Sequence, residues 1–333
     1  MKKLMNKPSG FVDEMLEGLV AANPSLALSG ETGRVVHRAK PIRSGKVGVV
    51  SGGGSGHLPL FTGYVGEGLL DSCSIGNVFE GPTVGSCMEA IRIANGSQGV
   101  LRLYGNYGGD RMNFDMAGEM LEDEGIRTTT VVGNDDVASA GPAERHKRRG
   151  VAGIIYAYKA AGALAETGAD LDAVTAIAQK TVDRTRTIGV ALSPCQVPGS
   201  DKPSFTLGEN EIEMGMGIHG EPGIWRDTLR EADAIADEMI ERLLADKPEG
   251  AGQRASILVN SLGATPLEEL FILYRRARGK LEAAGIEIVQ PLVGHYATSM
   301  EMAGASISLC FVDEEIEALL AAPAHCPFWT VSA

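Results

Sequence analysis

Short strand-like runs that alternate with longer helical patterns are the feature that most constrains how this chain can fold. Apolar runs with the length and composition of strands occur at 46–50, 99–104 and 127–132, and again at 255–260 and 306–312. Segments with helical spacing follow them along most of the chain, for example at about 226–246. This order is typical of α/β proteins, in which helices cover the faces of a sheet. The predicted fold class is therefore α/β, with two α/β domains that are each built on a mixed β-sheet covered by helices.

The division into two domains rests on length and on a change of composition. A chain of 333 residues is expected to form more than one domain, because domains cluster near roughly 100–200 residues. Residues 151–167 are predicted as a largely buried helix, 171–186 as an amphipathic helix and 187–192 as a strand, after which proline and polar residues dominate. We place the boundary before this strand, which predicts domains at 1–186 and 187–333.

Glycine is unusually frequent, with 43 of the 333 residues, nearly twice the usual share of about 7%. The glycines gather in "SGGGSGH" (51–57), "GNYGGD" (105–110) and "GMGIHGEPG" (215–223). Such clusters between apolar segments indicate shaped loops that lie close to a ligand. The first two follow predicted strands, where open α/β sheets bind ligands, so we expect them to share one crevice. The third closes a strand predicted over 211–218, and a site that spans both domains is expected.

The segment "SGGGSGH" matches none of the common phosphate-binding or nucleophile motifs. His57 stands where a Walker A pattern or a nucleophile elbow needs another residue, and no glycine lies three positions after Gly54. What remains is a loop of backbone amides that includes Gly54, Ser55 and Gly56. Such amides can bind small polar oxygens closely, because no Cβ stands in the way. A tight structural turn is the alternative interpretation.

Charge and composition exclude several classes of function. The net charge is −13, from 43 acidic and 30 basic residues, and such a surface repels nucleic-acid phosphates. The basic run "RHKRR" at 145–149 is interpreted as a solvated face or a cluster at a helix end. No signal sequence or long apolar run is visible, and the five cysteines form no CxxC pair. We expect a cytoplasmic protein that binds neither membranes nor nucleic acid.

Three side chains are candidates for chemistry. His57 and His219 differ from the other histidines because glycine-rich segments present both of them. Asp110 is either the N-cap of the helix that follows or a general base that accepts a proton from a hydroxyl. The pair at 135–136, "DD", is expected to cap a helix or to form bonds between the domains. Two histidines and an aspartate without metal-ligand spacing favour acid–base and nucleophilic chemistry over zinc binding.

Several segments together resemble one known family. The strings "VVSGGGSGH", "NYGGDRMNF", "RGVAG", "GIHGEPG", "LVNSLGATPLEELFIL" and "ATSMEMAGASISL" occur in this order, and the likeness extends from about residue 8 to the terminal "CPFW". They closely resemble the substrate-binding K subunit of dihydroxyacetone kinases. The resemblance implies a two-domain α/β protein, usually a homodimer, that acts as a subunit of a kinase for small ketoses.

The resemblance also implies roles for the candidate side chains. His219 is expected to add to the ketone carbonyl of the bound sugar and to form a covalent hemiaminal. An ordinary imidazole is mostly neutral at pH 7, so that its nitrogen lone pair is available for this addition. His57 and Asp110 are expected to polarise and deprotonate the terminal hydroxyl that attacks the phosphoryl donor. The backbone of residues 54–56 is expected to bind the substrate.

The phosphoryl donor is expected on another protein. In single-chain members of the family a helical nucleotide-binding domain follows the K region, whereas this sequence stops at residue 333. The resemblance therefore implies a separate L-type subunit that holds either exchangeable ATP or a tightly bound ADP, re-phosphorylated by a phosphotransferase relay, with magnesium. On this chain we expect no cofactor and no metal.

Two positions depart from the family pattern. Leu58 follows "SGGGSGH" where the family usually has glutamate, and Gly105 stands where it usually has a lysine that contacts substrate. The loss of a lysine removes a cation and opens space beside the sugar. We expect either a larger ketose than dihydroxyacetone, such as erythrulose, or reduced catalysis.

The alternative to a kinase subunit is a regulatory paralogue that binds the ketose without phosphoryl transfer. Retention of His57, Asp110 and His219 together favours the enzyme, because a sensor does not need the base. The absent lysine at Gly105 favours the sensor.

Overall fold

The computed structural model describes residues 2–332, and its contacts divide the chain into two compact units. The first unit contains the chain as far as Val132, together with Ala157–Lys180 and the segment from Leu319 onward. The second contains Gly133–Tyr156 and Thr181–Ala318. These units do not follow a single cut near residue 187. The division of the protein into functional domains at 1–186 and 187–333 stays a prediction.

Backbone pairing explains why residues after Val132 group with the second unit. The amide of Thr187 donates to the carbonyl of Asp135 at 2.8 Å, and the amide of Val137 donates to the carbonyl of Thr187 at 3.0 Å. The segment around Asp136 is therefore paired with a strand that lies about fifty residues later in the chain. Such pairing between distant segments is set by the tertiary fold and leaves no local signal in the sequence.

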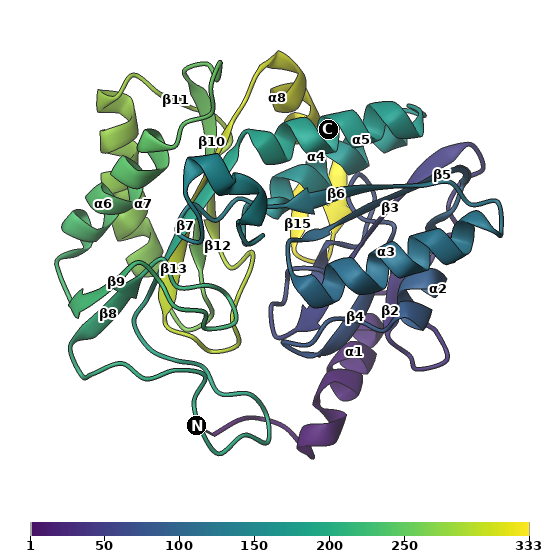
Figure 1. The fold of residues 1–333 in the computed structure, drawn as a ribbon, viewed down its shortest axis with the longest axis horizontal. Coiled ribbons are helices and arrows are strands. Elements are labelled where there is room, and N and C mark those ends of the chain that lie inside the picture. The colour runs from purple at the N-terminus through teal and green to yellow at the C-terminus, as the bar shows by residue number, and fades with distance from the viewer. Residues whose placement is uncertain (1, 333) are drawn as a thin grey trace. The chain divides into compact units, whose positions relative to one another are not determined.

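A six-stranded mixed sheet forms the first unit, with the order β1-β2-β4-β3-β5-β6. Strands β2 to β6 of this sheet are labelled in Figure 1. β3 is parallel to both of its neighbours, β4 and β5, whereas β2 is antiparallel to β1 and β4. The carboxyl ends of β3, β4 and β5 therefore meet at one edge of the sheet. The strands are Leu26–Ser29 (β1), Val35–Arg38 (β2), Lys46–Ser55 (β3), Ser72–Val78 (β4), Ser97–Gly105 (β5) and Thr128–Gly133 (β6).

Two helices of this unit share one core with the sheet. Helix α2 (Val84–Ala94) buries residues 87, 90, 91 and 94, and α3 (Gly108–Glu122) buries residues 114, 117 and 121. Spacings of three and four residues place these side chains on one face of each helix, which packs against β2, β3 and β5. Burial of each large apolar side chain is worth about 1.5–3 kcal/mol, so this interface stabilises the edge at which the strands end.

The remaining elements of the first unit, and those on residues 133–156 of the second unit, are mostly helical. The predicted buried helix at 151–167 is observed as α4, whereas the predicted amphipathic helix at 171–186 ends three residues early. The elements are α1 (Phe11–Ala22), α4 (Ile154–Glu166), α5 (Leu171–Asp183), three short 3-10 helices (Pro8–Gly10, Thr62–Tyr64 and Pro142–Lys147) and an antiparallel pair, β14 (Ala324–Cys326) and β15 (Trp329–Val331).

A seven-stranded mixed sheet forms the second unit, with the order β11-β10-β13-β7-β8-β9 and with β12 paired to β10. β10 is parallel to β11 and β12, and the remaining neighbours are antiparallel. Each unit thus has a mixed sheet covered by helices, which confirms the predicted fold class. The strands are Thr185–Ala191 (β7), Glu211–Met214 (β8), Trp225–Thr228 (β9), Arg254–Ser261 (β10), Glu287–Ile288 (β11), Leu292–Gly294 (β12) and Gly304–Phe311 (β13).

Helices α6 (Ala232–Ala245) and α7 (Leu267–Ala283) lie side by side against β10 and β13 (Figure 1). Their buried residues, at 235, 236, 239, 240 and 243 and at 270, 273, 277 and 281, again follow helical spacing. They share one apolar core with the inner strands of the sheet. Helix α8 (Glu314–Ala321) follows β13.

Two predicted elements of the second half are wrong in their extent. The strand predicted over 211–218 ends at Met214, because Gly215 adopts a φ of 82° and turns the chain out of the sheet. The helix predicted from about residue 226 begins at Ala232, because residues 225–228 pair with β8 as the strand β9.

Candidate functional site

Most of "SGGGSGH" is strand, which corrects the predicted loop of open amides. β3 continues to Ser55, and Gly52 and Gly53 pair with residues of β4. A register shift follows between Gly53 and Ser55, which places Gly54 at an irregular point of the strand. Gly56, with a φ of 103°, then turns the chain toward His57.

The glycines of β3 are required by what packs against them. A Cβ on Gly53 would lie 2.4 Å from the ring of Phe61. A Cβ on Gly54 would lie 2.8 Å from the backbone of both Phe79 and Glu80. The absence of side chains therefore lets the end of β3 contact the segment that follows β4 directly.

His57 is held between two aromatic rings and is 1% exposed. Its ring stacks on Phe79, with centroids 5.0 Å apart, and meets Phe61 edge-on at 6.0 Å. Both phenylalanines have a positive φ, 61° for Phe79 and 72° for Phe61. A positive φ in a bulky residue costs on the order of 1–3 kcal/mol, and such strain gathers at functional sites. The surroundings of His57 are thus tightly specified.

Asp110 lies in the first turn of α3, and the N-cap interpretation is wrong. The N-cap is Tyr107, so that Asp110 is the third helical residue. The helix starts earlier than its apolar pattern suggested because Gly108 and Gly109 already adopt helical geometry. The side chain is 6% exposed. A negative charge in the first turn is stabilised by the positive end of the helix dipole.

The segment of residues 79–82, which follows β4, brings these groups together. Its aromatic ring stacks on His57, its backbone lies against Gly54, and a Cβ on Gly81 would lie 2.5 Å from Oδ1 of Asp110. Sequence reasoning missed this segment. The available signal was the glycine–proline pair at 81–82, separated from the end of β4 by two residues, where both a turn and a ligand-binding loop are expected.

Gly105 is buried and is the last residue of β5, next to β3 in the sheet. Its carbonyl accepts a hydrogen bond from the amide of Tyr107 at 2.8 Å, which turns the chain into α3. The first unit therefore places Ser55, Gly105 and the start of α3 at one sheet edge. Leu58 follows His57, and its bond to Pro59 is cis.

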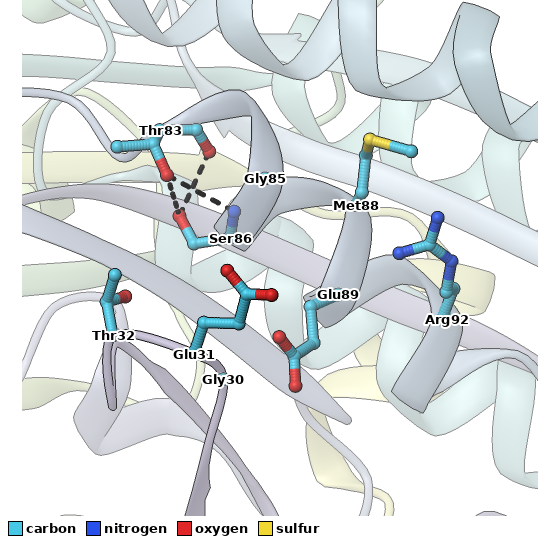
Figure 2. Close-up of a pocket in the computed structure, with 9 residues that line it drawn as sticks. All are labelled: Gly30, Glu31, Thr32, Thr83, Gly85, Ser86, Met88, Glu89 and Arg92. Carbon is cyan, nitrogen blue, oxygen red and sulfur yellow. Dashed lines mark hydrogen bonds between the residues drawn. The ribbon is translucent and has the colours of Figure 1, made fainter.

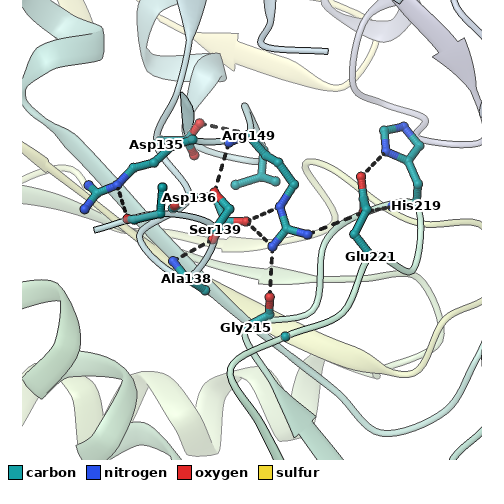
Figure 3. Close-up of polar contacts among 12 residues, drawn as sticks. Asp135, Asp136, Ala138, Ser139, Arg149, Gly215, His219 and Glu221 are labelled. Atoms are coloured by element: carbon teal, nitrogen blue, oxygen red, sulfur yellow. Dashed lines mark hydrogen bonds and ion pairs between the residues drawn. The ribbon is translucent and has the colours of Figure 1, made fainter. Parts of the chain in front are cut away.

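His219 lies in the second unit, on the segment between β8 and β9, and its side chain is 22% exposed. Its main-chain amide donates to Oε2 of Glu221 at 2.9 Å (Figure 3). Its Nδ1 lies 2.9 Å from the other carboxylate oxygen, Oε1. Gly220, with a φ of 82°, makes the turn that allows both contacts.

The charge of Glu221 assigns the proton on the ring. Burial alone would raise the pKa of Glu221, but the hydrogen bond from His219, and the positive charge of its ring once protonated, lower it to about 2. The carboxylate is therefore ionised at neutral pH and can only accept hydrogen bonds. Nδ1 must then carry the proton, which leaves the lone pair of the neutral imidazole on Nε2.

The basic run "RHKRR" is not a solvated face at its last two positions. Arg148 is 1% exposed and makes a two-pronged contact with Asp246, at 2.9 and 2.6 Å. Arg149 is 13% exposed and contacts Asp136 through Nε at 2.8 Å. Its Nη1 lies 3.9 Å from Oε2 of Glu221 (Figure 3). The sequence showed only a cluster of like charges, whereas carboxylates from distant segments neutralise two of them.

The pair at 135–136 acts within the second unit, and capping was one of its two expected roles. The carboxylate of Asp135 accepts from the amides of Val151 and Gly153, at 2.9 and 2.8 Å, just ahead of α4. Burial raises the pKa of Asp135, and it raises that of Asp136 to about 6 although Arg149 opposes the rise. Both carboxylates hold backbone turns together.

A pocket of about 280 Å³ in the first unit contains none of the predicted site residues (Figure 2). Glu31 and Glu89 line it beside the start of α2. The hydroxyls of Thr83 and Ser86 bond to each other at 3.0 Å, and Thr83 also accepts from the amide of Ser86 as the cap of α2. These polar groups serve the helix end.

Within residues 2–332 no group of three or more His, Cys, Asp or Glu side chains is arranged to hold a metal ion. No helix in the same range is both long enough and apolar enough to cross a membrane.

Curated relatives match nearly the whole chain. The dihydroxyacetone-binding subunit DhaK of the PEP-dependent dihydroxyacetone kinase of Escherichia coli K12 is 42% identical and covers 98% of each chain. The D-erythrulose kinase of Mycolicibacterium smegmatis is also 42% identical, over 98% of this chain. The chain spans only 56% of the length of that second relative.

Solved structures agree with this likeness. The dihydroxyacetone kinase of C. freundii superposes with a TM-score of 0.91 at 31% identity, over 99% of this chain and 60% of its own. A dihydroxyacetone kinase operon co-activator, DhaQ, superposes with a TM-score of 0.89 at 35% identity, over 95% of this chain and 97% of its own. Residues 17–328 match the family described as the Dak1 domain. The chain therefore belongs to the Dak1 domain family.

Proposed function

We propose that this chain is the ketose-binding subunit of a dihydroxyacetone-type kinase, which holds a short ketose covalently on His219 and presents its terminal hydroxyl for phosphorylation. The observation that carries the proposal is the contact of His219 with Glu221. It keeps the proton on Nδ1 and the lone pair on Nε2, on a glycine-rich segment. A relative named as a dihydroxyacetone-binding subunit has nearly the same length and is 42% identical.

The covalent step is an addition to the ketone. The lone pair on Nε2 of His219 forms a bond to the carbonyl carbon, and the π electrons of the C=O bond move to oxygen, which takes up one proton from the solvent. The ring carries one positive charge, spread over both nitrogens, until Nδ1 releases one proton to the solvent, so that the neutral hemiaminal forms with no net uptake of protons. The ionised carboxylate of Glu221, 2.9 Å from Nδ1, balances this charge. Addition selects a carbonyl compound over a polyol that could make similar hydrogen bonds.

The buried group in the first unit is proposed to act on the terminal hydroxyl. Asp110 accepts the proton of the hydroxyl, and His57 polarises the same oxygen. The backbone of residues 54–56 binds the sugar, which the irregular pairing at Gly54 supports because it frees the strand from regular hydrogen bonding. Phosphoryl transfer depends mainly on such positioning.

The phosphoryl donor is proposed to come from an L-type nucleotide-binding subunit. It would hold exchangeable ATP, or ADP that a phosphotransferase relay re-phosphorylates, together with magnesium. The name of the E. coli relative, a binding subunit of a PEP-dependent kinase, supports the separation of the two tasks. The homodimer that the family resemblance implies is part of the proposal. So is a cytoplasmic location, which fits five cysteines that are all free thiols.

We propose a four-carbon ketose such as erythrulose as the substrate. Overall identity does not choose between sugars, because a dihydroxyacetone-binding subunit and a D-erythrulose kinase are both 42% identical to this chain. The choice rests on Gly105, which ends β5 at the sheet edge where the parallel strand β3 also ends, and which adds no side chain there. A lysine at this position would occupy that space with the methylene groups of its side chain and would add a positive charge.

A carbon-13 experiment tests the covalent step. Dihydroxyacetone and erythrulose, each labelled at the ketone carbon, are added to the full chain, and the carbon spectrum is followed. Conversion of the carbonyl signal to that of a tetrahedral carbon in a protein-bound species is expected, and it is expected to vanish in H219A. A wild-type protein that binds the sugar with its carbonyl signal intact contradicts the proposal.

A regulatory protein is the second candidate, and one observation favours it. The DhaQ co-activator matches at 35% identity over nearly its full length. An assay that combines the chain with L-type subunits, and with both kinds of donor, separates the two functions. Ketose phosphate formed only with this chain present supports the kinase. Adduct formation without phosphate under every donor condition assigns the chain to the sensors.

A further inference from the structure

Arg149 ties the segment that carries His219 to a buried turn at the start of the second unit (Figure 3). We propose that Arg149 is a positioning residue for the His219 ring: it holds the Glu221 carboxylate in the orientation that accepts the Nδ1 proton, and so keeps Nε2 as the nucleophilic atom. The inference deepens the proposed function and rests on it. It adds a residue that lies far from the histidine in sequence.

The guanidinium contacts three acceptors at once. Nε and Nη2 approach the same oxygen of Asp136, at 2.8 and 2.7 Å, and Nη2 also donates to the carbonyl of Gly215 at 3.1 Å. Nη1 faces Oε2 of Glu221 at 3.9 Å. The planar fork of arginine allows this division of contacts, which the point charge of lysine cannot reproduce. One side chain therefore links the first residue of the glycine-rich segment to the partner of the histidine.

Gly217 allows the side chains of Glu221 and Arg149 to approach each other. A Cβ at this position would lie 2.1 Å from Oε2 of Glu221 and 2.6 Å from Nη1 of Arg149. Its amide donates to the carbonyl of Glu221 at 3.0 Å. A glycine at residue 217 thus leaves the space in which the carboxylate and the guanidinium meet.

The other end of Arg149 is fixed by a satisfied turn. Asp136 is 2% exposed, and its carboxylate also accepts from the amide of Ala138 at 3.0 Å. The amide of Asp136 donates to the carbonyl of Arg149 at 3.1 Å, and the amide of Arg149 donates to the hydroxyl of Ser139 at 3.0 Å. Because both the backbone and the side chain of Arg149 are held, its guanidinium can orient Glu221 without further ordering.

The charges along this line determine the direction of the expected effects. In spatial order along the line of contacts, the groups are the carboxylate of Asp136, the guanidinium of Arg149, the carboxylate of Glu221 and the ring of His219. Asp135 lies beside Asp136. Protonation of the ring competes with attack on the ketone, because it removes the lone pair. The positive charge of Arg149 opposes this protonation. Loss of Arg149 should therefore raise the pH below which the adduct disappears.

The experiment measures the adduct against pH. The full chain is mixed with erythrulose or dihydroxyacetone labelled with carbon-13 at the ketone carbon, and the fraction of tetrahedral carbon is followed from pH 5 to 8. For R149M we expect about fivefold less adduct at pH 7.5 and a midpoint at higher pH. R149K keeps the charge but not the fork, so it should keep the midpoint and still lose adduct.

R226M is the matched control. Arg226 forms an ion pair with Glu213 at 2.6 Å, and Glu213 accepts from the amide of Gly223 on the same segment. This variant perturbs an arginine–carboxylate pair next to the segment without touching Glu221. It should change neither the amount of adduct nor its midpoint. An effect of R226M equal to that of R149M, or an R149M protein that matches wild type in both readouts, overturns the inference.

A second variant keeps the inference testable if R149M does not fold, and a second measurement keeps it testable if no adduct forms. D136N removes the charge on the far side of the guanidinium, so it should lower the midpoint. Nitrogen-15 shifts of the His219 ring report the tautomer without any sugar. Wild type should carry the proton on Nδ1, and R149M should show a mixture. If wild type forms no adduct, the covalent step of the proposed function fails, and the tautomer alone still tests the role of Arg149. If wild type does form the adduct, an unchanged tautomer in R149M together with an unmoved midpoint in D136N refutes the positioning role of Arg149.

Discussion

The two histidines of the predicted site are held in different ways. His57, in the first unit, is 1% exposed and packs between two aromatic rings at the end of a strand. His219, in the second unit, is 22% exposed and contacts an ionised carboxylate. Packing against aromatic side chains fixes the position of the His57 ring, whereas the contact with a charged carboxylate fixes the position of the His219 ring. Changes of volume should therefore affect the His57 group most, whereas changes of charge or pH should affect His219 most.

The largest expected effect separates the two histidine groups by function. D110N removes the proposed base, so phosphoryl transfer should fall by about a hundredfold or more, while the carbon-13 adduct remains. H219A should abolish the adduct and transfer together. The measurements are ketose phosphate formation with an L-type subunit and the carbon spectrum of the bound sugar.

Equal loss of adduct in D110N and H219A would show that the two groups do not divide the chemistry in this way. The control is the unfolding curve of each variant, since a variant that has lost its fold is uninformative.

Acid stability should depend on the His219 group through Glu221. The folded pKa of Glu221, about 2, lies below the ordinary 4.5, so the ionised form stabilises the folded state. This contribution is fully present above about pH 4.5 and is lost as the pH falls toward 2, and it amounts to about 3 kcal/mol. The difference in unfolding free energy between wild type and E221Q should therefore narrow between pH 5 and 3. Denaturant titrations measure it.

Asp136 provides a control for that measurement, because its contribution to folding stability changes with pH in the opposite direction to that of Glu221. Its pKa is raised by burial to about 6, so the protonated form is favoured in the folded state. Its contribution to stability therefore decreases as the pH rises from about 4 to 6. A difference between wild type and E221Q that does not change with pH would contradict the assignment of Glu221.

A pair of glycine substitutions tests packing against charge directly. In G53A the new Cβ would lie 2.4 Å from the ring of Phe61, so unfolding should become easier by about 1–3 kcal/mol while the adduct is retained. In G217A the Cβ would lie 2.1 Å from Oε2 of Glu221, so the adduct should fall by about tenfold as the carboxylate shifts. Thermal unfolding and the carbon spectrum are both recorded. Loss of adduct in G53A, with loss of stability but not of adduct in G217A, would refute the distinction between packing at His57 and charge at His219.

The smallest expected effect concerns the choice of sugar. G105K places a lysine at the end of β5, at the sheet edge where β3 also ends. It should shift preference from erythrulose toward dihydroxyacetone by tenfold or less, since the space of a few methylene groups is worth about 1–3 kcal/mol. Competition between the two sugars in the carbon spectrum measures it. An unchanged ratio would show that Gly105 does not determine ketose size.

Much of the fold was predictable because strands and buried helices carry local patterns. The strands at 99–104 and 255–260 and the buried helix at 151–167 are all present, with ends shifted by a few residues. The edge strand β9 was missed because it is short and mostly exposed, and so has no apolar pattern. The glycine at residue 215 ended β8 earlier than its composition indicated.

The site was predictable only where a residue type and its local surroundings carry the signal. His57, Asp110 and His219 stood out because glycines flank them. Arg149 did not, since within "RHKRR" it is one cation among four, and its partners lie in other parts of the chain. The residues 79–82 were missed for the same reason: their contacts with His57 and Asp110 exist only when three strand ends meet at one edge.

The sequence by itself determined the α/β class, the positions of the glycine-rich segments and the identity of the imidazoles that they present. These features follow from local periodicity and from the backbone freedom of glycine, which need no knowledge of distant residues. Only the tertiary structure decided which carboxylate faces His219, which nitrogen of that ring keeps its lone pair, and which arginine stands behind the carboxylate. The reason is that electrostatic interactions act through space over a few ångströms, and the chain brings residues 136, 149 and 221 together only on folding.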